Sequence, residues 1–285
     1  MYYYGLVTAA VIMFGFQFLL NGQYEKESGT ALTSVLKFTL GSFATGFVVL
    51  MIINKFSFEF TPFTLIMALL DAVNFLLYNF FAIKALSKIN LSLFSIFAML
   101  GGMALPFAAG LIFYDEKMTL GKGICFAAIT VALFLTMQKG ESKKGYIYYI
   151  GVFVTNGLAG VIPKVFSSAK NYDKTSEAGF QILVALIMVI LSGILLIFIR
   201  GDKSFPKKKS LLCMAGYGTL SNVANYLSLL GLAGLPATAQ FPFITGGVMI
   251  VSTILCFFTP DKPKKKEIAS VVISFAGLMC LVLMQ

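Results

Sequence analysis

The chain contains ten apolar runs, each about as long as a helix must be to cross a membrane, and this feature limits its fold more than any other. A hydrocarbon core of about 30 Å requires roughly 20 apolar residues in a helix. The runs that meet this length cover residues 2–20, 31–53, 62–83, 91–114, 119–138, 145–166, 178–199, 210–231, 236–258 and 267–284. The sequence therefore predicts an all-α, multi-pass transmembrane protein of ten helices, with no room for a soluble domain.

The composition agrees with this prediction and excludes several classes of protein. Charged residues make up only 12% of the chain, about half of what a soluble domain uses to cover its surface. Histidine is absent, and the four cysteines all lie inside apolar runs without a CxxC pair. We therefore predict no metal site, no disulfide framework and no cofactor.

Ten spans divide into five and five, and an odd number in each half inserts the second half upside down relative to the first. We expect one repeat over residues 1–140 and the other over residues 141–285. A shift of 146 residues aligns Asn79 with Asn225 and Gly101 with Gly247. The pattern is typical of inverted-topology transporters.

Basic residues are distributed unevenly between the two sets of loops. Of the 22 lysines and arginines, fifteen fall in the loops that include Lys207–Lys209 and Lys264–Lys266, and six fall in the opposite loops. Because basic loops stay in the cytoplasm, both termini are predicted to lie outside it. The two lysine tracts are interpreted as anchors against anionic lipid rather than as a nucleic-acid site.

Two stretches of the first half resemble the EamA half-repeat of the drug/metabolite transporter superfamily. These are Ala85–Ser92, before the fourth predicted helix, and Phe113–Leu120, before the fifth. The family usually has Gly-Glu-Arg-x-Thr at the second of these turns, where this chain has Asp115 in place of the glycine. The resemblance implies a ten-helix transporter of metabolites, organic cations or drugs.

Asp71 is the candidate residue with the clearest chemistry. It lies mid-way along the third apolar run, where a charged side chain costs about 2.5–3.5 kcal/mol and should face a cavity or a partner. Asn74 and Tyr78 follow at i+3 and i+7, on the same helical face. Such a carboxyl could carry a proton or bind a cationic solute, or it could be a structural group bonded to a neighbouring helix.

The eighth run supplies a second polar face, made by Tyr217, Ser221 and Asn225 at a spacing of four residues. We predict that this face and the Asp71 face line one substrate cavity. The alternative is that these side chains bond between helices in the bundle.

Three other charged residues have competing interpretations. Lys37 and Lys164 could bind an anionic solute, such as an anionic sugar or a nucleotide-sugar, or could extend along their apolar stems to the membrane surface. Glu116 is expected to cap the helix that follows it. Glycines and prolines near Pro106 and Pro242 interrupt the fourth and ninth runs, and they indicate either bending points or close helix packing.

These features together predict a secondary transporter in the cell membrane that moves a small organic solute by alternating access. No nucleotide-binding motif is present, so a gradient would supply the energy, and Asp71 makes the proton the expected coupling ion. The lone acid favours a cationic or zwitterionic solute. An intramembrane enzyme is disfavoured because the chain has no histidine and no HExxH motif. A receptor or scaffold that transports nothing stays open, and the chain is expected to act as a monomer or homodimer.

Overall fold

The computed structural model describes residues 1–29, 31–86, 91–136, 146–201, 204–258 and 262–284. Every regular element in these ranges is an α-helix, which confirms the predicted all-α class. The ten helices are α1 (Tyr2–Ser28), α2 (Leu32–Ile53), α3 (Pro62–Leu86), α4 (Leu91–Phe113), α5 (Leu120–Leu135), α6 (Tyr146–Ser168), α7 (Glu177–Phe198), α8 (Lys208–Leu232), α9 (Ala237–Cys256) and α10 (Lys265–Leu283).

Eight of these helices, within the described ranges, are long and apolar enough to span a membrane by length and composition. The other two are α5, which has 16 residues, and α8. Helix α8 is long enough at 25 residues, but its polar side chains lower its mean hydropathy. It packs against α1 and α2, so these side chains face protein on at least part of the helix.

Helix α1 is longer than its apolar run predicts. The first apolar run ends at residue 20, but the helix continues through the polar segment 21–27 to Ser28. Gln, Glu and Lys in this segment are good helix formers, and Glu27 forms an ion pair with Lys209 of α8. The helix ends at Gly29, whose positive φ of 71° is a conformation that glycine adopts readily.

The packing partners of the helices repeat with a period of five. Helix α1 packs against α8 and α9, and α6, five helices later, packs against α3 and α4. In the same way α2 contacts α7 and α8, while α7 contacts α2 and α3. The pairs α4–α9 and α5–α10 each join a helix to its own counterpart. This is the pairing that a two-fold relation between two five-helix repeats requires. The predicted boundary between residues 140 and 141 lies outside the described residues.

Two aligned glycines mark equivalent close contacts in the two halves. A Cβ atom on Gly101 of α4 would overlap the carbonyl oxygen of Phe153 in α6. A Cβ atom on Gly247 of α9 would lie 2.8 Å from Cγ1 of Val11 in α1. Both helices continue unbroken past Pro106 and Pro242. Close packing, rather than a break in the helix, therefore accounts for these glycines.

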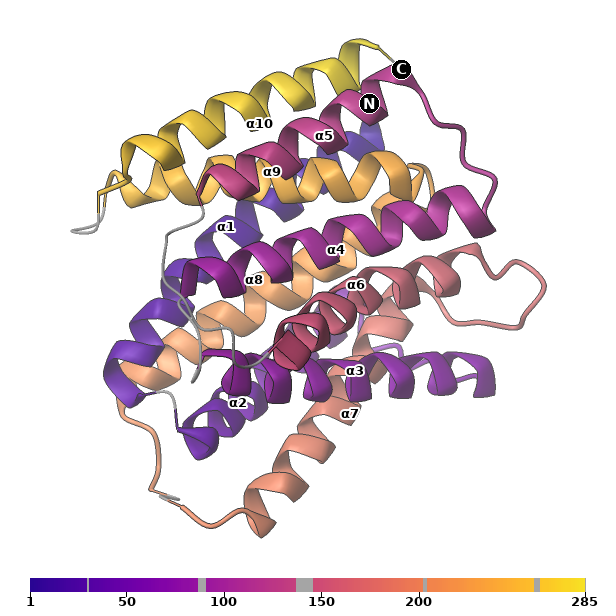
Figure 1. Ribbon diagram of the computed structural model, residues 1–285. Helices are drawn as coiled ribbons and strands as arrows, with labels where there is room; N and C mark the ends of the chain where they lie inside the picture. Colours follow the sequence, from indigo (N-terminus) through magenta and orange to yellow (C-terminus); the bar gives the residue numbers. More distant parts are fainter. Residues whose placement is uncertain (30, 87–90, 137–145, 202–203, 259–261, 285) are drawn as a thin grey trace.

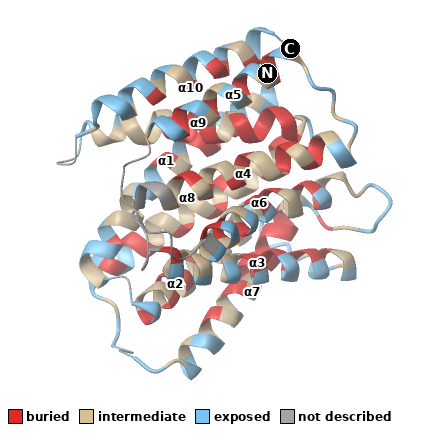
Figure 2. Ribbon diagram, in the orientation of Figure 1, coloured by how far each residue is buried: buried red, intermediate tan, exposed pale blue. Residues whose placement is uncertain are grey.

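Both chain termini lie at one end of the bundle (Figure 1). We call this end the terminal face, and it includes the turns at 54–61, 114–119 and 169–176. The opposite end, with Arg200 and the lysines before α8 and α10, is called the basic face. Figure 2 shows α9 as mostly buried, whereas α10 exposes much of its length. An apolar exposed exterior around a buried centre is what a bundle in lipid requires.

Candidate functional site

Asp71 lies near the middle of α3 and is only 2% exposed. Its Oδ1 atom is fully buried without a hydrogen-bond partner, and no hydrogen bond or ion pair joins the side chain to any described residue. Ala68 and Phe75, one turn to either side, belong to a large apolar cluster. The interhelical bond that a structural Asp71 would make is therefore not seen within the described chain. Such a carboxyl favours its neutral form until a proton donor or cation reaches it.

Asn74 lies almost one turn after Asp71 and is also buried. Its amide nitrogen donates to the carbonyl oxygen of Thr155 in α6, at 2.9 Å, and this bond joins the two halves of the chain. Its Oδ1 atom, like that of Asp71, is buried without a partner. This face of α3 therefore presents two hydrogen-bond acceptors with unused capacity.

The phenols of Tyr78 in α3 and Tyr217 in α8 are near enough to interact electrostatically. Ser221, one turn along α8, interacts with the Tyr217 phenol, and the Tyr217 ring packs against Phe38 of α2 at 4.6 Å. The structure thus brings together Tyr78, Tyr217 and Ser221 from two helices. Asn225 is half-buried, and no hydrogen bond joins it to a described residue. That all six predicted residues line one cavity stays a prediction.

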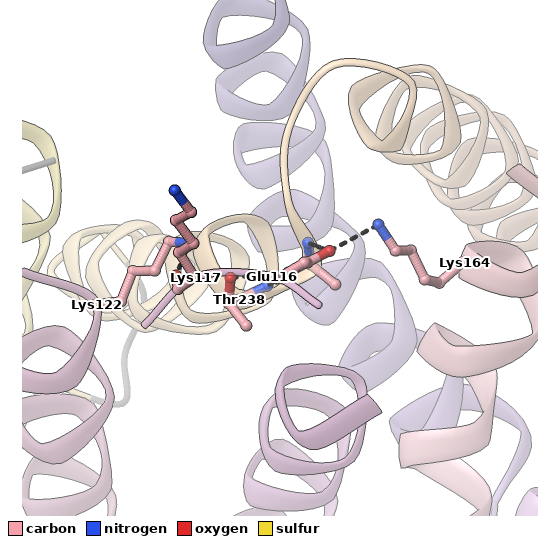
Figure 3. A network of polar contacts seen from close by, with 6 residues as sticks. Glu116, Lys117, Lys122, Lys164 and Thr238 are labelled. Atoms are coloured by element: carbon pink, nitrogen blue, oxygen red, sulfur yellow. Dashed lines mark hydrogen bonds and ion pairs between the residues drawn. The ribbon is translucent and has the colours of Figure 1, made fainter. Parts of the chain in front are cut away.

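A second polar site surrounds Glu116, on the terminal face, between α4 and α5 (Figure 3). Its carboxylate accepts hydrogen bonds from the backbone nitrogens of Ala237 and Thr238, at 2.9 and 2.8 Å, and from the Thr238 hydroxyl at 2.8 Å. These donors form the first turn of α9, where the free N–H groups attract an anion. The expectation that Glu116 caps α5 is therefore wrong. Thr119 caps α5, because its hydroxyl accepts from the Lys122 nitrogen.

Lys164 of α6 completes this site. Its Nζ lies 2.7 Å from Glu116 Oε1, with the two side chains 9% and 8% exposed, and it also lies over the Tyr114 ring at 5.0 Å. Lys164 is therefore buried against Glu116 rather than extended along its apolar stem to an exposed position. Lys37 does reach the end of its helix, where its Nζ donates to the Ser204 carbonyl oxygen at 2.7 Å on the basic face.

The pKa of Glu116 reports the balance of forces at this site. Burial raises the pKa of the carboxyl, but the hydrogen bonds from Lys164 and from the first turn of α9 together lower it below its ordinary value. Glu116 is therefore a carboxylate at neutral pH, and it joins the first half of the chain to α6 and α9 of the second half. We call Glu116, Lys164 and Thr238 the terminal-face clamp.

The turn that positions Glu116 contains Asp115, whose φ is 49°. This is the left-handed region, which favours glycine and which Asp tolerates better than most residues. The physical requirement at this position explains why an aspartate can stand where the family usually has glycine. A second acid, Glu59, acts similarly nearby: it accepts from the Ser176 nitrogen at 2.7 Å and the Ser176 hydroxyl at 3.0 Å, at the start of α7.

The chain resembles known proteins in both its fold and its sequence. A solved crystal structure superimposes with a TM-score of 0.80 at 13% sequence identity, covering 98% of this chain and 95% of that one. At such low identity the likeness establishes the fold alone. Residues 143–283 match the model of the EamA-like transporter family.

The second half of the chain therefore carries the sequence pattern of the EamA-like transporter family. No curated protein matches its sequence. This match confirms the predicted resemblance, and it indicates a membrane-embedded, multi-pass transporter of the drug/metabolite superfamily. The family match covers the second half, whereas the stretches that carried the resemblance in the sequence lie in the first. Of those stretches, residues 87–90 lie outside the described ranges.

The clamp is the feature of this EamA-like protein that sequence reasoning missed. The signal was present, because Glu116 and Lys164 are both charged residues close to the ends of apolar runs. Their sequence separation gave no indication that they form a pair. Among the described residues there is no group of three or more histidine, cysteine, aspartate or glutamate side chains that could hold a metal ion.

Proposed function

We propose that this EamA-like protein is a secondary transporter that carries a small organic solute with a cationic or zwitterionic group by alternating access. The family match of residues 143–283 supports a transporter, and the buried Asp71 supports the finer assignment. A carboxyl in apolar surroundings, with no partner among the described residues, is unfavourable when charged, and ionisable residues inside transmembrane helices are usually functional.

Unused acceptor capacity supports the assignment of the solute. Asp71 and Asn74 each have a buried oxygen that no described residue contacts through a hydrogen bond. A protonated amine brings several N–H donors and one positive charge, so it satisfies both oxygens and neutralises the carboxylate. An anionic solute would instead face two lone-pair-bearing oxygens, which repel it.

Proton coupling follows if the proton and the solute compete for Asp71. The neutral carboxyl loses its proton to water when the ammonium group binds, and it regains a proton when the solute leaves. Opposite movement of proton and solute then needs no second acid. The residues proposed to bind the solute are Asp71, Asn74, Tyr78, Tyr217, Ser221 and Asn225.

The decisive experiment is transport by purified protein in liposomes with an imposed pH gradient. The solute is first chosen by screening amines, amino acids and drug-like cations for thermal stabilisation in detergent. Asp71→Asn keeps the shape of the side chain but cannot titrate, so we expect it to abolish proton-driven accumulation while the protein still folds. Asp115→Asn is the matched control, because this aspartate is exposed and Asn also tolerates a positive φ. Uphill transport by Asp71→Asn with unchanged pH dependence would show that Asp71 is structural.

Aqueous access to the two helices can be tested separately. In a background lacking Cys125, Cys213, Cys256 and Cys280, cysteines introduced at Asn74 and Ser221 should react with small water-soluble thiol reagents. Bound solute should protect both positions. Inert thiols at both would mean that these faces are packed, whatever the solute is.

The anionic alternative depends on Lys37 and Lys164. Both are engaged, Lys164 with Glu116 and Lys37 with the Ser204 carbonyl, so an anion would have to displace internal partners. Charge reversal at each lysine, with uptake measured, discriminates this case. A receptor or scaffold would instead show solute binding without transport, or no solute-dependent stabilisation at all.

The membrane arrangement is part of the same proposal. We propose a cell-membrane location, both termini outside the cytoplasm, two repeats divided near residues 140 and 141, and a monomer or homodimer. The excess of basic residues on one set of loops supports the orientation.

A further inference from the structure

A cavity of about 140 Å³ lies between α4, α5, α9 and α10, towards the basic face. It is several times larger than the space one water molecule needs. Its walls include the end of α5, the last turns of α9 and the first turns of α10. Asp71 and the terminal-face clamp are not among its lining residues.

Several residues that carry a hydroxyl or carboxyl group line this cavity. Among them are Ser252, Ser270 and Glu267. Ser252 donates its proton to the Met249 carbonyl at 3.1 Å, and Ser270 donates to the Glu267 carbonyl at 2.8 Å. Because a hydroxyl has a single proton, each oxygen is left with lone pairs to offer.

Glu267 contributes the only formal charge among the described lining residues. Its Oε2 accepts from the Lys264 nitrogen at 2.9 Å at the start of α10, and no interaction involves its Oε1 within the described chain. The neighbouring lysines 264–266 are exposed, and none of them lines the cavity. The lining therefore offers one negative charge and several acceptors, without a cation of its own.

We infer that this cavity binds a small monovalent cation, either a sodium ion or a primary ammonium group, through Glu267, Ser252 and Ser270. One carboxylate balances a single positive charge, which disfavours a divalent ion. Hydroxyl and carboxylate oxygens are the ligands that hard cations prefer. Ser270 is 1% exposed, so its oxygen is held in place by packing.

The site joins the two halves of the chain. Helices α4 and α5 belong to the first half, and α9 and α10 belong to the second. A cation that fills the cavity stabilises the packing arrangement in which these four helices surround it. The inference is separate from the assignment of Asp71 as the solute carboxyl, because the two sites share no residue.

The test measures thermal unfolding of the purified protein in detergent, with sodium chloride replaced by choline chloride at constant ionic strength. A third series uses methylammonium chloride, and a fourth uses ethanolamine hydrochloride, which carries the headgroup of a common lipid. We expect sodium or methylammonium to raise Tm by roughly 3–6 °C at about ten times its Kd, relative to choline. Choline is the reference because its methylated nitrogen has no N–H donors.

Three variants make the result specific. Glu267→Gln removes the charge but keeps an oxygen that can accept from the Lys264 nitrogen, and Ser270→Ala removes a lining hydroxyl. Both should lose most of the cation-dependent rise in Tm. Glu25→Gln is the matched control, since this exposed glutamate on α1 lies at the same end of the bundle and outside the cavity, and it should keep the full rise.

Each outcome decides the inference. Stabilisation by sodium would identify the ligand as a metal ion. Stabilisation by methylammonium but not by sodium would identify it as an ammonium group. A larger rise in Tm with ethanolamine than with methylammonium would indicate a lipid headgroup. Equal responses to all salts, or a full response in Glu267→Gln, would overturn the cation site. A variant that unfolds before the measurement is replaced by Ser252→Ala, which leaves the start of α10 intact.

Discussion

Replacement of Glu116 by Gln is the sharpest test of the terminal-face clamp. The substitution keeps the size of the side chain and one carbonyl oxygen. It removes the negative charge that Lys164 and the first turn of α9 share. The new NH2 group must then lie opposite donors, either the α9 nitrogens or the Lys164 ammonium.

The expected cost follows from the burial of the pair. Both side chains are less than a tenth exposed, so Lys164 would be left with an uncompensated charge in a largely dry site. Breaking such a pair by removing one partner costs about 3–5 kcal/mol. In chains of about this size, each kcal/mol of lost unfolding free energy lowers Tm by roughly 2–4 °C. We therefore expect Tm to fall by about 6–20 °C.

The assay can use the protein's own cysteines. Cys125 and Cys213 are buried, so a thiol-reactive fluorophore reports their exposure as the protein unfolds in detergent. Glu25→Gln serves again as an exposed control and should unfold within about 1 °C of the unmodified protein, as surface changes usually do.

A double variant separates the ion pair from general damage. Lys164→Met removes the stranded charge, so Glu116→Gln combined with Lys164→Met should recover part of the stability lost in Glu116→Gln alone. An unchanged Tm for Glu116→Gln would refute the clamp. Strictly additive losses in the double variant would show that the two residues do not interact.

Three further predictions concern pH, packing and topology. The pKa of Glu116 is lowered in the folded protein. The stabilisation by this carboxylate is therefore present above the ordinary carboxyl pKa of about 4.3, and it is lost as pH falls through the lower folded value. The Tm difference between the unmodified protein and Glu116→Gln should shrink below about pH 4. Gly101→Ala should cost about 1–3 kcal/mol, because its Cβ overlaps the Phe153 carbonyl, whereas Gly5→Ala, with open space around it, should be neutral or slightly stabilising in the same thermal assay. A C-terminal alkaline phosphatase fusion should be active and a fluorescent fusion dark; a fluorescent cytoplasmic fusion would reverse the orientation.

Much of the fold followed directly from the sequence, because the bilayer allows few alternatives. A chain must satisfy every backbone group internally in lipid, so a 20-residue apolar run can only be a helix. Most predicted runs match helices within a few residues, as in residues 31–53 against Leu32–Ile53. The apolar run did not predict the end of α1, because residues 21–27 are polar. An apolar run indicates which residues lie in lipid, and a helix can continue beyond them.

The candidate site was less predictable from the sequence than the fold was. The burial of Asp71 could be predicted, because a charge in the middle of an apolar run must avoid lipid. That Asp71 has no partner among the described residues could not be predicted, since the helices that pack most closely on α3 are α6 and α7, far along the chain. The same reason hid the role of Glu116, which is 48 residues from Lys164 and more than a hundred from Thr238.

The sequence by itself determined the fold class, the number of helices and the half of the chain to which each belongs, because these depend on local composition and length. Only the tertiary structure decided which helix ends meet. The contact between Glu116 and the first turn of α9, and the cavity beside Glu267, exist because helix packing brings α4 and α5 against α9 and α10. Electrostatic pairing acts over a few ångströms in space and is independent of distance along the chain, so no local pattern could encode it.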